Sequence, residues 1–271
     1  MNRFDDLFSR RGRNAFVPFF TLGDPDWDTS LEIIVSAVHA GADALELGYP
    51  FADPISDGPT NQKSMQRALR AGATFDSCTK LVSTIRGRFP DLPISLLLYY
   101  NLLYFQADEG YRKLADAGVD AVVVSDLPFE ESGRHVDCLC RHDIGRVHMV
   151  APNTPADRAR VLFEESRAFT YVISRFGTTG ADRQLGAATV QRVCLLRSIT
   201  DKPYVVGFGI SHPDHVRQIW DAGADGVIVG SHFISMIERH VAAITPAIAG
   251  ICGFIEEVKS TAVAAPAHAA N

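Results

Sequence analysis

Two acidic residues in the first quarter of the chain have the type and the surroundings that acid–base chemistry requires. Residues 44–48 have the sequence Ala-Leu-Glu-Leu-Gly, an alternation typical of a β-strand, so the two leucines face one side and Glu46 faces the other. A buried carboxylate that meets no cation has a raised pKa, which suits a general acid or base. The alternative is that Glu46 forms an internal salt bridge, for example with an arginine.

A second carboxylate is predicted to share this site. The loop of residues 49–59 carries Asp53 and Asp57 within a proline-rich, turn-forming stretch. Either aspartate could simply cap a turn. Asp57, which precedes Gly58-Pro59, is the candidate to face Glu46 across a pocket, and two carboxylates at one site would allow paired proton transfers.

Glycines in the last third of the chain predict an anion site. Residues 207–211 (Gly-Phe-Gly-Ile-Ser) follow one apolar stretch, and Gly230-Ser231 end the next, just before a helix. Glycines let backbone N–H groups approach a phosphate, and a helix N-terminus favours negative charge. The alternative is that these glycines only make tight turns. The polar loop 175–180, which contains two glycines, is predicted to be a lid that closes over a substrate.

An internal repetition predicts the elements that must position these residues. The segments 40–46, 117–123 and 222–228 each begin Ala-Gly-x-Asp and continue with mostly apolar residues. In each, a helix is expected to end at the glycine, which can adopt a left-handed cap conformation, and a strand starts two residues later. A helix that leads into a strand in three places predicts alternating α and β elements, and therefore a parallel sheet.

Eight apolar stretches complete this alternation and predict the strands, at residues 16–21, 43–48, 94–99, 121–125, 146–150, 169–174, 204–208 and 226–229. The stretches between them are amphipathic; Leu31, Ile34, Val35 and Val38, for example, fall on one helical face. An open, doubly wound sheet is the rival architecture, but no Gly-x-Gly-x-x-Gly opens its first helix.

The predicted fold is therefore α/β, a single-domain TIM (β/α)8 barrel with an extra N-terminal helix. It is predicted to occupy residues 1–260, with a disordered tail over the Ala- and Pro-rich residues 261–271. In such barrels the reacting groups lie at the carboxyl ends of the strands, where Glu46, Asp57 and the glycines fall.

Composition limits the classes of function. The chain of 271 residues has a formal net charge of −6 and lacks the basic footprint of nucleic-acid or anionic-membrane binding. It has no apolar signal segment at its N-terminus and no apolar run of about 18 residues that could span a bilayer. Its five cysteines, an odd number, fit a reduced cytoplasmic protein better than a secreted one.

Metal and Schiff-base chemistry are disfavoured. Cys138 and Cys140 lie near His135, His142 and His148, but Cys-x-Cys without a second ligand pair fits helix packing better than a metal site. None of the five lysines falls at the carboxyl end of a strand, which argues against a Schiff-base aldolase. Only His148 lies within a predicted strand, which argues against a multi-histidine zinc site. The sequence therefore predicts metal-free acid–base chemistry on a small phosphorylated substrate.

Four groups of residues together resemble one known family, the tryptophan synthase alpha chains. They are residues 45–59, residues 16–19 with 21–25, residues 174–175 with 178–180, and residues 207–211 with 230–231. The similarity extends from about residue 4 to residue 257, with the motifs in the family's order. The resemblance implies a lyase that cleaves indole-3-glycerol phosphate into indole and glyceraldehyde 3-phosphate in tryptophan biosynthesis, without a cofactor.

The resemblance also implies roles for individual residues. Glu46 matches the family's acid–base glutamate, and Asp57 matches the aspartate that meets the indole nitrogen. The residues implied to line the indole pocket or its mouth are Phe19, Leu97, Tyr99, Asp126 and Tyr171. Thr179 would couple closure of the lid to Asp57. The residues implied to hold the phosphate are Gly180, Gly209, Gly230 and Ser231.

Three residues depart from the family's usual pattern. Tyr49 stands where a small aliphatic residue is common, Ala52 stands where serine or threonine is usual, and Phe176 in the lid is bulky. They leave the predicted acid–base pair intact and bear on the shape of the pocket and the lid.

A partner chain is also implied by the resemblance. The family's alpha chain docks on a beta chain that depends on pyridoxal phosphate, so an α2β2 complex is expected, with that cofactor only in the beta chain. A stand-alone indole-3-glycerol phosphate lyase that releases free indole has the same motifs and is an open alternative. A third possibility is a non-catalytic binding or activating subunit, but the presence of both Glu46 and Asp57 argues against it. A fourth is a different phosphosugar barrel enzyme, such as an isomerase.

Overall fold

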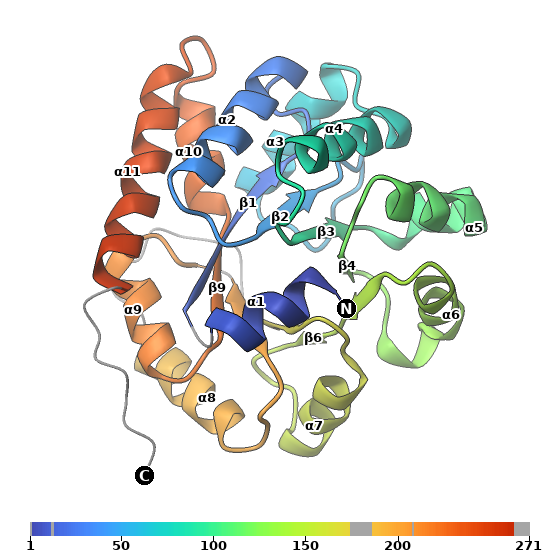
Figure 1. Cartoon of the computed structure of the whole chain (residues 1–271), viewed down its shortest axis with the longest axis vertical. Helices are drawn as coiled ribbons and strands as arrows, with labels where there is room; N and C mark the ends of the chain where they lie inside the picture. Colours follow the sequence, from blue (N-terminus) through green and yellow to red (C-terminus); the bar gives the residue numbers. More distant parts are fainter. Residues whose placement is uncertain (1, 12–13, 174–185, 208, 263–271) are drawn as a thin grey trace.

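One parallel sheet closes into a barrel at the centre of the protein (Figure 1). The computed structural model describes residues 2–11, 14–173, 186–207 and 209–262. The strands are β1 (Ala15–Thr21), β2 (Leu45–Gly48), β3 (Ile94–Leu98), β4 (Ala121–Val124), β5 (Gly145–Val147), β6 (Met149–Val150), β7 (Thr170–Ile173), β8 (Tyr204–Gly207) and β9 (Gly226–Val229). They pair in the order β5-β4-β3-β2-β1-β9-β8-β7-β6.

The barrel closes at a single residue, His148. The two end strands of the sheet, β5 and β6, are consecutive in the chain and separated only by His148. The backbone N–H of His148 donates to Ser166 Oγ (3.2 Å) instead of to a neighbouring strand, while its carbonyl accepts from Tyr171 N (2.9 Å). Together β5 and β6 are therefore the fifth strand of an eight-stranded barrel.

Helices surround the strands on the outside of the barrel (Figure 1). They are α1 (Arg3–Arg11), α2 (Trp27–His39), α3 (Pro59–Arg70), α4 (Phe75–Arg88), α5 (Tyr100–Asp116), the 3-10 helix η1 (Phe129–Glu131), α6 (Gly133–Arg141), α7 (Ala156–Glu165), α8 (Ala187–Arg197), α9 (Pro213–Asp221), α10 (Ser231–Arg239) and α11 (Thr245–Ala262). Helix α1 lies across the amino-terminal end of the barrel, where Asn2 Nδ2 donates to the Asp120 carbonyl (2.6 Å) and Phe4 is fully buried against Phe169.

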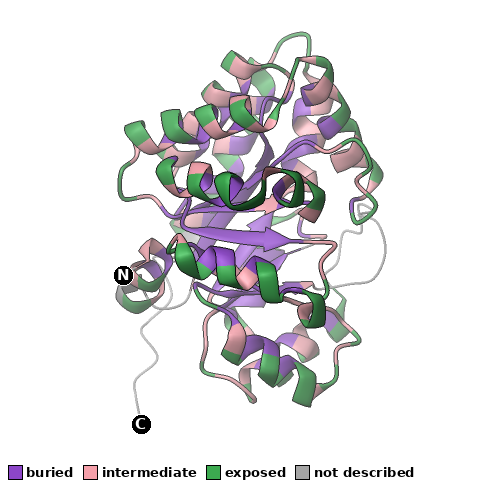
Figure 2. Cartoon of the chain, turned by 90° about the vertical axis from the view of Figure 1, so that its right-hand side faces the viewer, coloured by how far each residue is buried: buried purple, intermediate pink, exposed green. Residues whose placement is uncertain are grey.

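The strands are buried on both faces, as Figure 2 shows by the continuous buried colouring of the central sheet. One face packs on the helices and the other fills the barrel, which is the usual burial pattern of an all-parallel sheet. No helix within the described ranges is long and apolar enough to cross a membrane.

The predicted barrel and its N-terminal helix are confirmed, and the differences lie at element ends. Tyr99 was predicted to end a strand, but it caps α5, because its backbone is extended where the helix begins. The fifth predicted strand is divided at His148. Helix α11 continues to Ala262, so the first two residues of the predicted disordered tail are helical, and the rest of that tail lies outside the described residues.

The buried face of α2 is displaced from the predicted one. The fully buried residues of this helix are Ser30, Ile33, Ile34 and Ala37. Of the predicted face only Ile34 is fully buried, and Leu31 and Val38 are partly buried at its edges. The prediction followed the larger side chains, whereas the small residues Ser30 and Ala37 let the helix approach the barrel closely.

The repeated Ala-Gly-x-Asp segments bond neighbouring strands together at the amino-terminal end of the barrel. Asp43, just before β2, accepts from Phe16 N of β1 (2.8 Å). Asp120, just before β4, accepts from Ile94 N of β3 (2.8 Å). Asp225, just before β9, accepts from Tyr204 N of β8 (3.0 Å). In each case a carboxylate joins its own strand to the preceding one.

Each of these aspartates also meets a cation. Lys259 of α11 binds Asp43 (2.6 Å), and Arg86 of α4 binds Asp120 (2.7 Å). Arg197 of α8 binds Asp225. Arg86 and Arg197 additionally donate to the carbonyl of the glycine two residues before their aspartate, so the helix that precedes the strand pair is tied to the same point. The repetition in the sequence is therefore structural in origin.

We expect Asp120→Ala to lower the free energy of unfolding by about 2–4 kcal/mol, because it leaves the Ile94 N–H without an acceptor and the largely buried Arg86 without its carboxylate. Urea denaturation followed by circular dichroism would measure this. Asp116→Ala is the matched control, since its pair with Arg112 is exposed and should contribute less than about 1 kcal/mol. Equal effects of the two substitutions would contradict the assigned role of Asp120.

Candidate active site

A cavity opens at the carboxyl ends of the strands and brings most of the predicted site residues together. The residues that line it are Phe19, Glu46, Asp57, Gly58, Asn61, Leu97, Tyr171, Gly209, Ile210, Ile228, Gly230 and Ser231. They come from strands β1, β2, β3, β7 and β9, from the loops after β2, β8 and β9, and from the first turns of α3 and α10. This is the end of a (β/α)8 barrel at which catalytic groups are found.

Glu46 points into the barrel as the alternation of β2 predicts. Its side chain is 1% exposed, whereas Leu45 and Leu47 are buried on the other face against the helices. Burial, and to a smaller degree the charge of Asp57, raises the pKa of Glu46 to about 8. No ion pair within the described residues involves Glu46, and its Oε1 atom has no hydrogen-bond partner there. The salt-bridge alternative for Glu46 is therefore wrong for this part of the chain.

Asp57 lines the same cavity and is held by two donors. The Tyr99 hydroxyl donates to Asp57 Oδ2 (2.6 Å), and Asn61 Nδ2 donates to Asp57 Oδ1 (3.0 Å). Burial raises the pKa of Asp57, and these two hydrogen bonds oppose the rise. The two carboxyl groups therefore differ, since Glu46 is buried and poorly solvated while Asp57 has donors that stabilise its ionised form.

Three glycines make room for two aromatic rings in the barrel. A Cβ at Gly207 would lie 2.2 Å from the Tyr171 hydroxyl, and a Cβ at Gly48 would lie 2.7 Å from the ring of Phe19. A Cβ at Gly230 would lie 3.0 Å from the same ring. Tyr171 and Phe19, both predicted pocket residues, thus pack against bare backbone beside Glu46.

The other predicted pocket residues occupy different positions. Leu97 lines the cavity. Tyr99 contacts Asp57 through its hydroxyl, which donates to Asp57 Oδ2 and also accepts from Ser56 N (3.0 Å). Asp126 is absent from the cavity lining and instead accepts from Tyr100 N (2.7 Å) at the start of α5. Thr179 and the predicted lid lie outside the described residues.

The predicted anion site lies at the other side of the same cavity. Gly209, with a φ of +75°, and Gly230 and Ser231 at the start of α10 all line it. The first backbone N–H groups of a helix have no partner within the helix and carry partial positive charge, so this corner suits a phosphate. Gly180, the remaining predicted phosphate residue, lies outside the described residues.

Four lining residues were missed by sequence reasoning: Gly58, Asn61, Ile210 and Ile228. Ile228 had a signal, because it alternates onto the same face of its strand as Gly230. Asn61 also had one, because it lies four residues after Asp57 at the start of a helix, within reach of its carboxylate.

Two features that drew interest in the sequence are structural. Tyr49 is fully buried on the helix side of β2, where its hydroxyl contacts Thr79 Oγ1 (2.9 Å) and its ring lies 5.4 Å from that of Phe75. It therefore stays out of the cavity. His135 Nδ1 is bonded to the Tyr111 hydroxyl (2.7 Å), and the described ranges contain no group of three or more His, Cys, Asp or Glu residues that could hold a metal ion.

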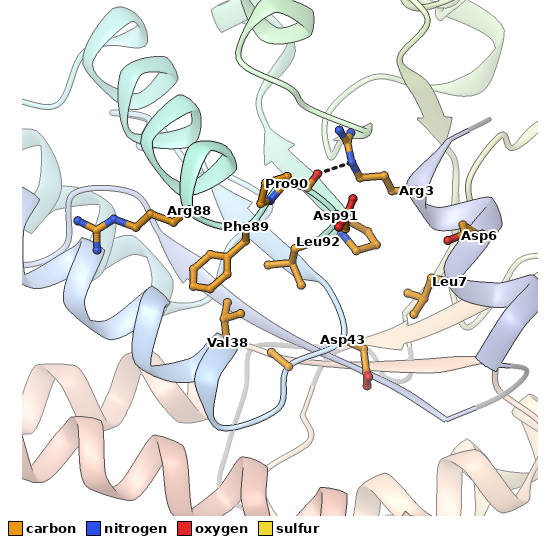
Figure 3. Close-up of a pocket in the computed structure, with 12 residues that line it drawn as sticks. Arg3, Asp6, Leu7, Val38, Asp43, Arg88, Phe89, Pro90, Asp91 and Leu92 are labelled. Atoms are coloured by element: carbon orange, nitrogen blue, oxygen red, sulfur yellow. Dashed lines mark hydrogen bonds between the residues drawn. The ribbon is translucent and has the colours of Figure 1, made fainter.

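A second cavity, of about 480 Å³, lies at the opposite end of the barrel (Figure 3). Phe89, Leu92 and Val38 lie on one side of it, and Arg3, on the other side, donates to the Pro90 carbonyl (2.8 Å). Its buried carboxylate, Asp43, is already bonded to Lys259 and to Phe16 N. Although this cavity is the larger of the two, the residues that line it do not suggest a reaction. The smaller cavity with Glu46 is therefore the better candidate active site.

The closed (β/α)8 barrel, with two unlike carboxyl groups at its carboxyl end and a phosphate corner beside them, defines an acid–base enzyme acting on a small phosphorylated substrate. Residues 6–263 match the family model described as "Tryptophan synthase alpha chain". The chain belongs to this family. It is thus a lyase that cleaves indole-3-glycerol phosphate in tryptophan synthesis, which sets aside the non-catalytic subunit and the isomerase.

Individual relatives agree. The chain is 46% identical to the tryptophan synthase alpha chain of Methanothermobacter thermautotrophicus over 87% of both chains. It is 41% identical to that of Escherichia coli over 96% of this chain and 98% of the other. A chain in a solved tryptophan synthase α2β2 complex from Pyrococcus furiosus matches with a TM-score of 0.83 and 32% identity, covering 91% of this chain and 98% of that one.

The raised pKa of Glu46 makes stability depend on pH. Between its ordinary value of 4.5 and about 8, Glu46 is protonated in the folded state and ionised in the unfolded state. Its contribution to stability is therefore complete at low pH and is lost as the pH rises through about 8. We expect the free energy of unfolding of Glu46→Gln, relative to wild type, to increase by about 2–4 kcal/mol between pH 5 and pH 8. Urea titrations at several pH values would measure it, and parallel pH dependences would contradict the assignment.

Proposed function

We propose that Glu46 is the acid and base of the cleavage. A carboxyl group with a pKa of about 8 is mostly protonated at neutral pH, so Glu46 can deliver a proton to C3 of the indole ring. Protonation makes a positively charged indolenine, which accepts the electron pair of the breaking C–C bond. The carboxylate left on Glu46 can then take the proton from the hydroxyl of the adjacent glycerol carbon, which becomes the aldehyde. The products are indole and glyceraldehyde 3-phosphate, and Glu46 ends protonated as it began.

Asp57 is proposed to stabilise the charge that develops on the indole nitrogen. An ionised carboxylate that is already held by Tyr99 and Asn61 needs no reorientation when the ring N–H becomes acidic. The position of Asp57 beside Glu46 in one cavity supports this division of roles. The indole ring would lie between Phe19, Leu97 and Tyr171, with Tyr99 and Asp126 nearer the mouth.

The phosphate of the substrate is proposed to bind at Gly209, Gly230 and Ser231, with Gly180 completing the site. The backbone N–H groups at the start of α10 supply donors without a cation. Because the phosphate does not react, its binding energy serves to hold C3 beside Glu46. Thr179 is proposed to couple closure of the lid to Asp57.

A tryptophan synthase beta chain is the proposed partner, in an α2β2 complex with pyridoxal phosphate in the beta chain. Two exposed aromatic residues in the first turns of α5 support a docking surface near the mouth of the barrel. Phe105 is 80% exposed and Tyr104 is 52% exposed, and Ile55 in the loop after β2 is 74% exposed. Large apolar side chains at this exposure often mark protein interfaces. The solved Pyrococcus furiosus relative is itself a complex of this kind.

A stand-alone lyase is the second candidate, because it would need the same cavity and the same carboxyl groups. A cytoplasmic location is proposed for either, supported by the five cysteines, none of which is paired. The dependence of turnover on a beta chain separates the two candidates.

We expect Glu46→Gln to lower kcat for indole release by about 10²- to 10⁴-fold, because the amide can neither give nor take the proton. Asp57→Asn should lower it by about 10²-fold, because the charge opposite the indole nitrogen is lost. Indole release from indole-3-glycerol phosphate by the purified chain measures both effects. Asp53→Asn is the control, since this aspartate lies in the same loop but is exposed, and it should keep wild-type activity. Full activity of Glu46→Gln would overturn the proposed mechanism.

We expect a beta chain from the same organism to raise indole turnover steeply, and Phe105→Asp to weaken that effect by at least about tenfold in half-saturating beta-chain concentration. Leu195→Asp on α8 is the matched control, because Leu195 is also exposed (48%) but belongs to the other half of the barrel. Fast turnover that ignores the beta chain would establish the stand-alone lyase instead. Unchanged stimulation of Phe105→Asp would remove α5 from the interface.

A further inference from the structure

Helix α3 is fixed against the barrel by polar contacts along one face. Ser64 Oγ contacts Thr21 Oγ1 of β1 (2.6 Å) and donates to the Asn61 carbonyl (2.8 Å). Arg67 forms two hydrogen bonds with the buried Asp24 (2.7 and 2.8 Å). Asn61, Ser64 and Arg67 are spaced three residues apart, so they share this face of the helix. The side chain of Asn61 is thereby directed at the cavity.

Asn61 completes a two-sided grip on the Asp57 carboxylate. Its Nδ2 atom donates to Asp57 Oδ1 (3.0 Å), while the Tyr99 hydroxyl donates to Oδ2 (2.6 Å). The orientation of the Asn61 amide is determined by this contact, because the reverse orientation would place two acceptor oxygens against each other. The carboxylate can therefore neither rotate nor tilt without losing a donor.

The remaining atom of the amide has no partner. Asn61 Oδ1 is buried and accepts no hydrogen bond within the described residues. An unpaired buried acceptor destabilises the folded state by about 1–3 kcal/mol, so such atoms are uncommon away from functional sites. Among the described residues that line this cavity, Glu46 Oε1 is the other buried carboxyl or amide oxygen without a partner.

We propose that Asn61 is a positioning residue of the lyase: its amide nitrogen holds the Asp57 carboxylate in place, and its amide oxygen accepts a hydrogen bond from a donor on the bound substrate. The inference rests on the proposed role of Asp57 as the group that meets the indole nitrogen. Hydrophobic packing does not explain an amide here, because its polar atoms point at a carboxylate and into a cavity.

The hydrogen bonds from Asn61 and Tyr99 also affect the pH range in which Asp57 is ionised. Among the described residues, the titratable groups that face Asp57 are Glu46 from β2, Tyr99 before α5 and Tyr171 from β7, and no lysine or arginine of this part of the chain lines the cavity. Without a cation, the two hydrogen bonds are what oppose the effect of burial on the pKa of Asp57. Loss of Asn61 should therefore raise that pKa and require a higher pH for activity.

The test is the pH dependence of kcat/KM for indole-3-glycerol phosphate in Asn61→Leu and Asn61→Ala, with folding checked by circular dichroism. We expect the acidic limb of the profile to move upward by roughly one pH unit in both variants. We also expect kcat to fall about tenfold at pH 6 and less at pH 8, because a larger fraction of Asp57 is ionised at the higher pH. Two variants of different size separate the loss of the amide from a change in packing.

Gln62→Ala is the matched control. Gln62 is the next residue of α3 and donates to the backbone carbonyl of Asp57 (2.8 Å), so its removal disturbs the same turn without touching the carboxylate. Its acidic limb should coincide with that of wild type. Wild-type limbs in both Asn61 variants, or an equal shift in Gln62→Ala, would overturn the proposal.

Asp57→Asn, measured in parallel, separates the two levels of inference. Wild-type activity of Asp57→Asn would show that the proposed role of Asp57 itself is wrong. Loss of activity in Asp57→Asn together with unshifted limbs in the Asn61 variants would leave the role of Asp57 intact and remove only that of Asn61.

Discussion

The register between neighbouring strands is the constraint on which every group at the mouth of the barrel depends. Successive side chains of a strand point to opposite faces, so a slip of one residue would exchange Glu46 for a leucine inside the barrel. Asp43 bonds β2 to β1 at their amino-terminal ends, and the same two strands pair Glu46 with Phe19 farther along. Contacts at one end of the barrel thus determine which side chains line the cavity at the other.

The cavity holds two carboxyl groups in unlike surroundings. Within the described residues Glu46 meets no cation and no donor to Oε1, and burial raises its pKa, whereas Asp57 accepts hydrogen bonds through both of its oxygens. Such a division is how one site supplies an acid and a negative charge at the same pH. The arrangement sacrifices stability, because a buried and partly unsatisfied carboxyl group is unfavourable in the folded state. The surrounding core, with the three bonded aspartates beneath it, offsets that penalty.

The fold and the burial of Glu46 inside the barrel were predictable from the sequence because their signals are local. The alternation in residues 44–48 predicts on which side of its strand Glu46 lies, and the three repeated segments predict the alternating helices and strands of the barrel. Contacts between distant segments were not predictable: the hydrogen bond from the Tyr99 hydroxyl to Asp57 joins residues 42 positions apart, and the placement of Asp126 at the start of α5 depends on where β4 ends. The break of the fifth strand at His148 likewise follows from a hydrogen bond to Ser166, which no local pattern encodes.

The packing of Phe19 against Gly48 and Gly230 has a consequence for the range of substrates that a redesigned barrel could accept. The ring fills the space that side chains at both glycines would otherwise occupy, in the same layer as Glu46. A shorter side chain at position 19 would therefore enlarge the cavity beside the backbone of Gly48 and Gly230. Indoles with bulky ring substituents would be accommodated by engineering at this one position, while Gly48 and Gly230 stay fixed unless Phe19 changes with them.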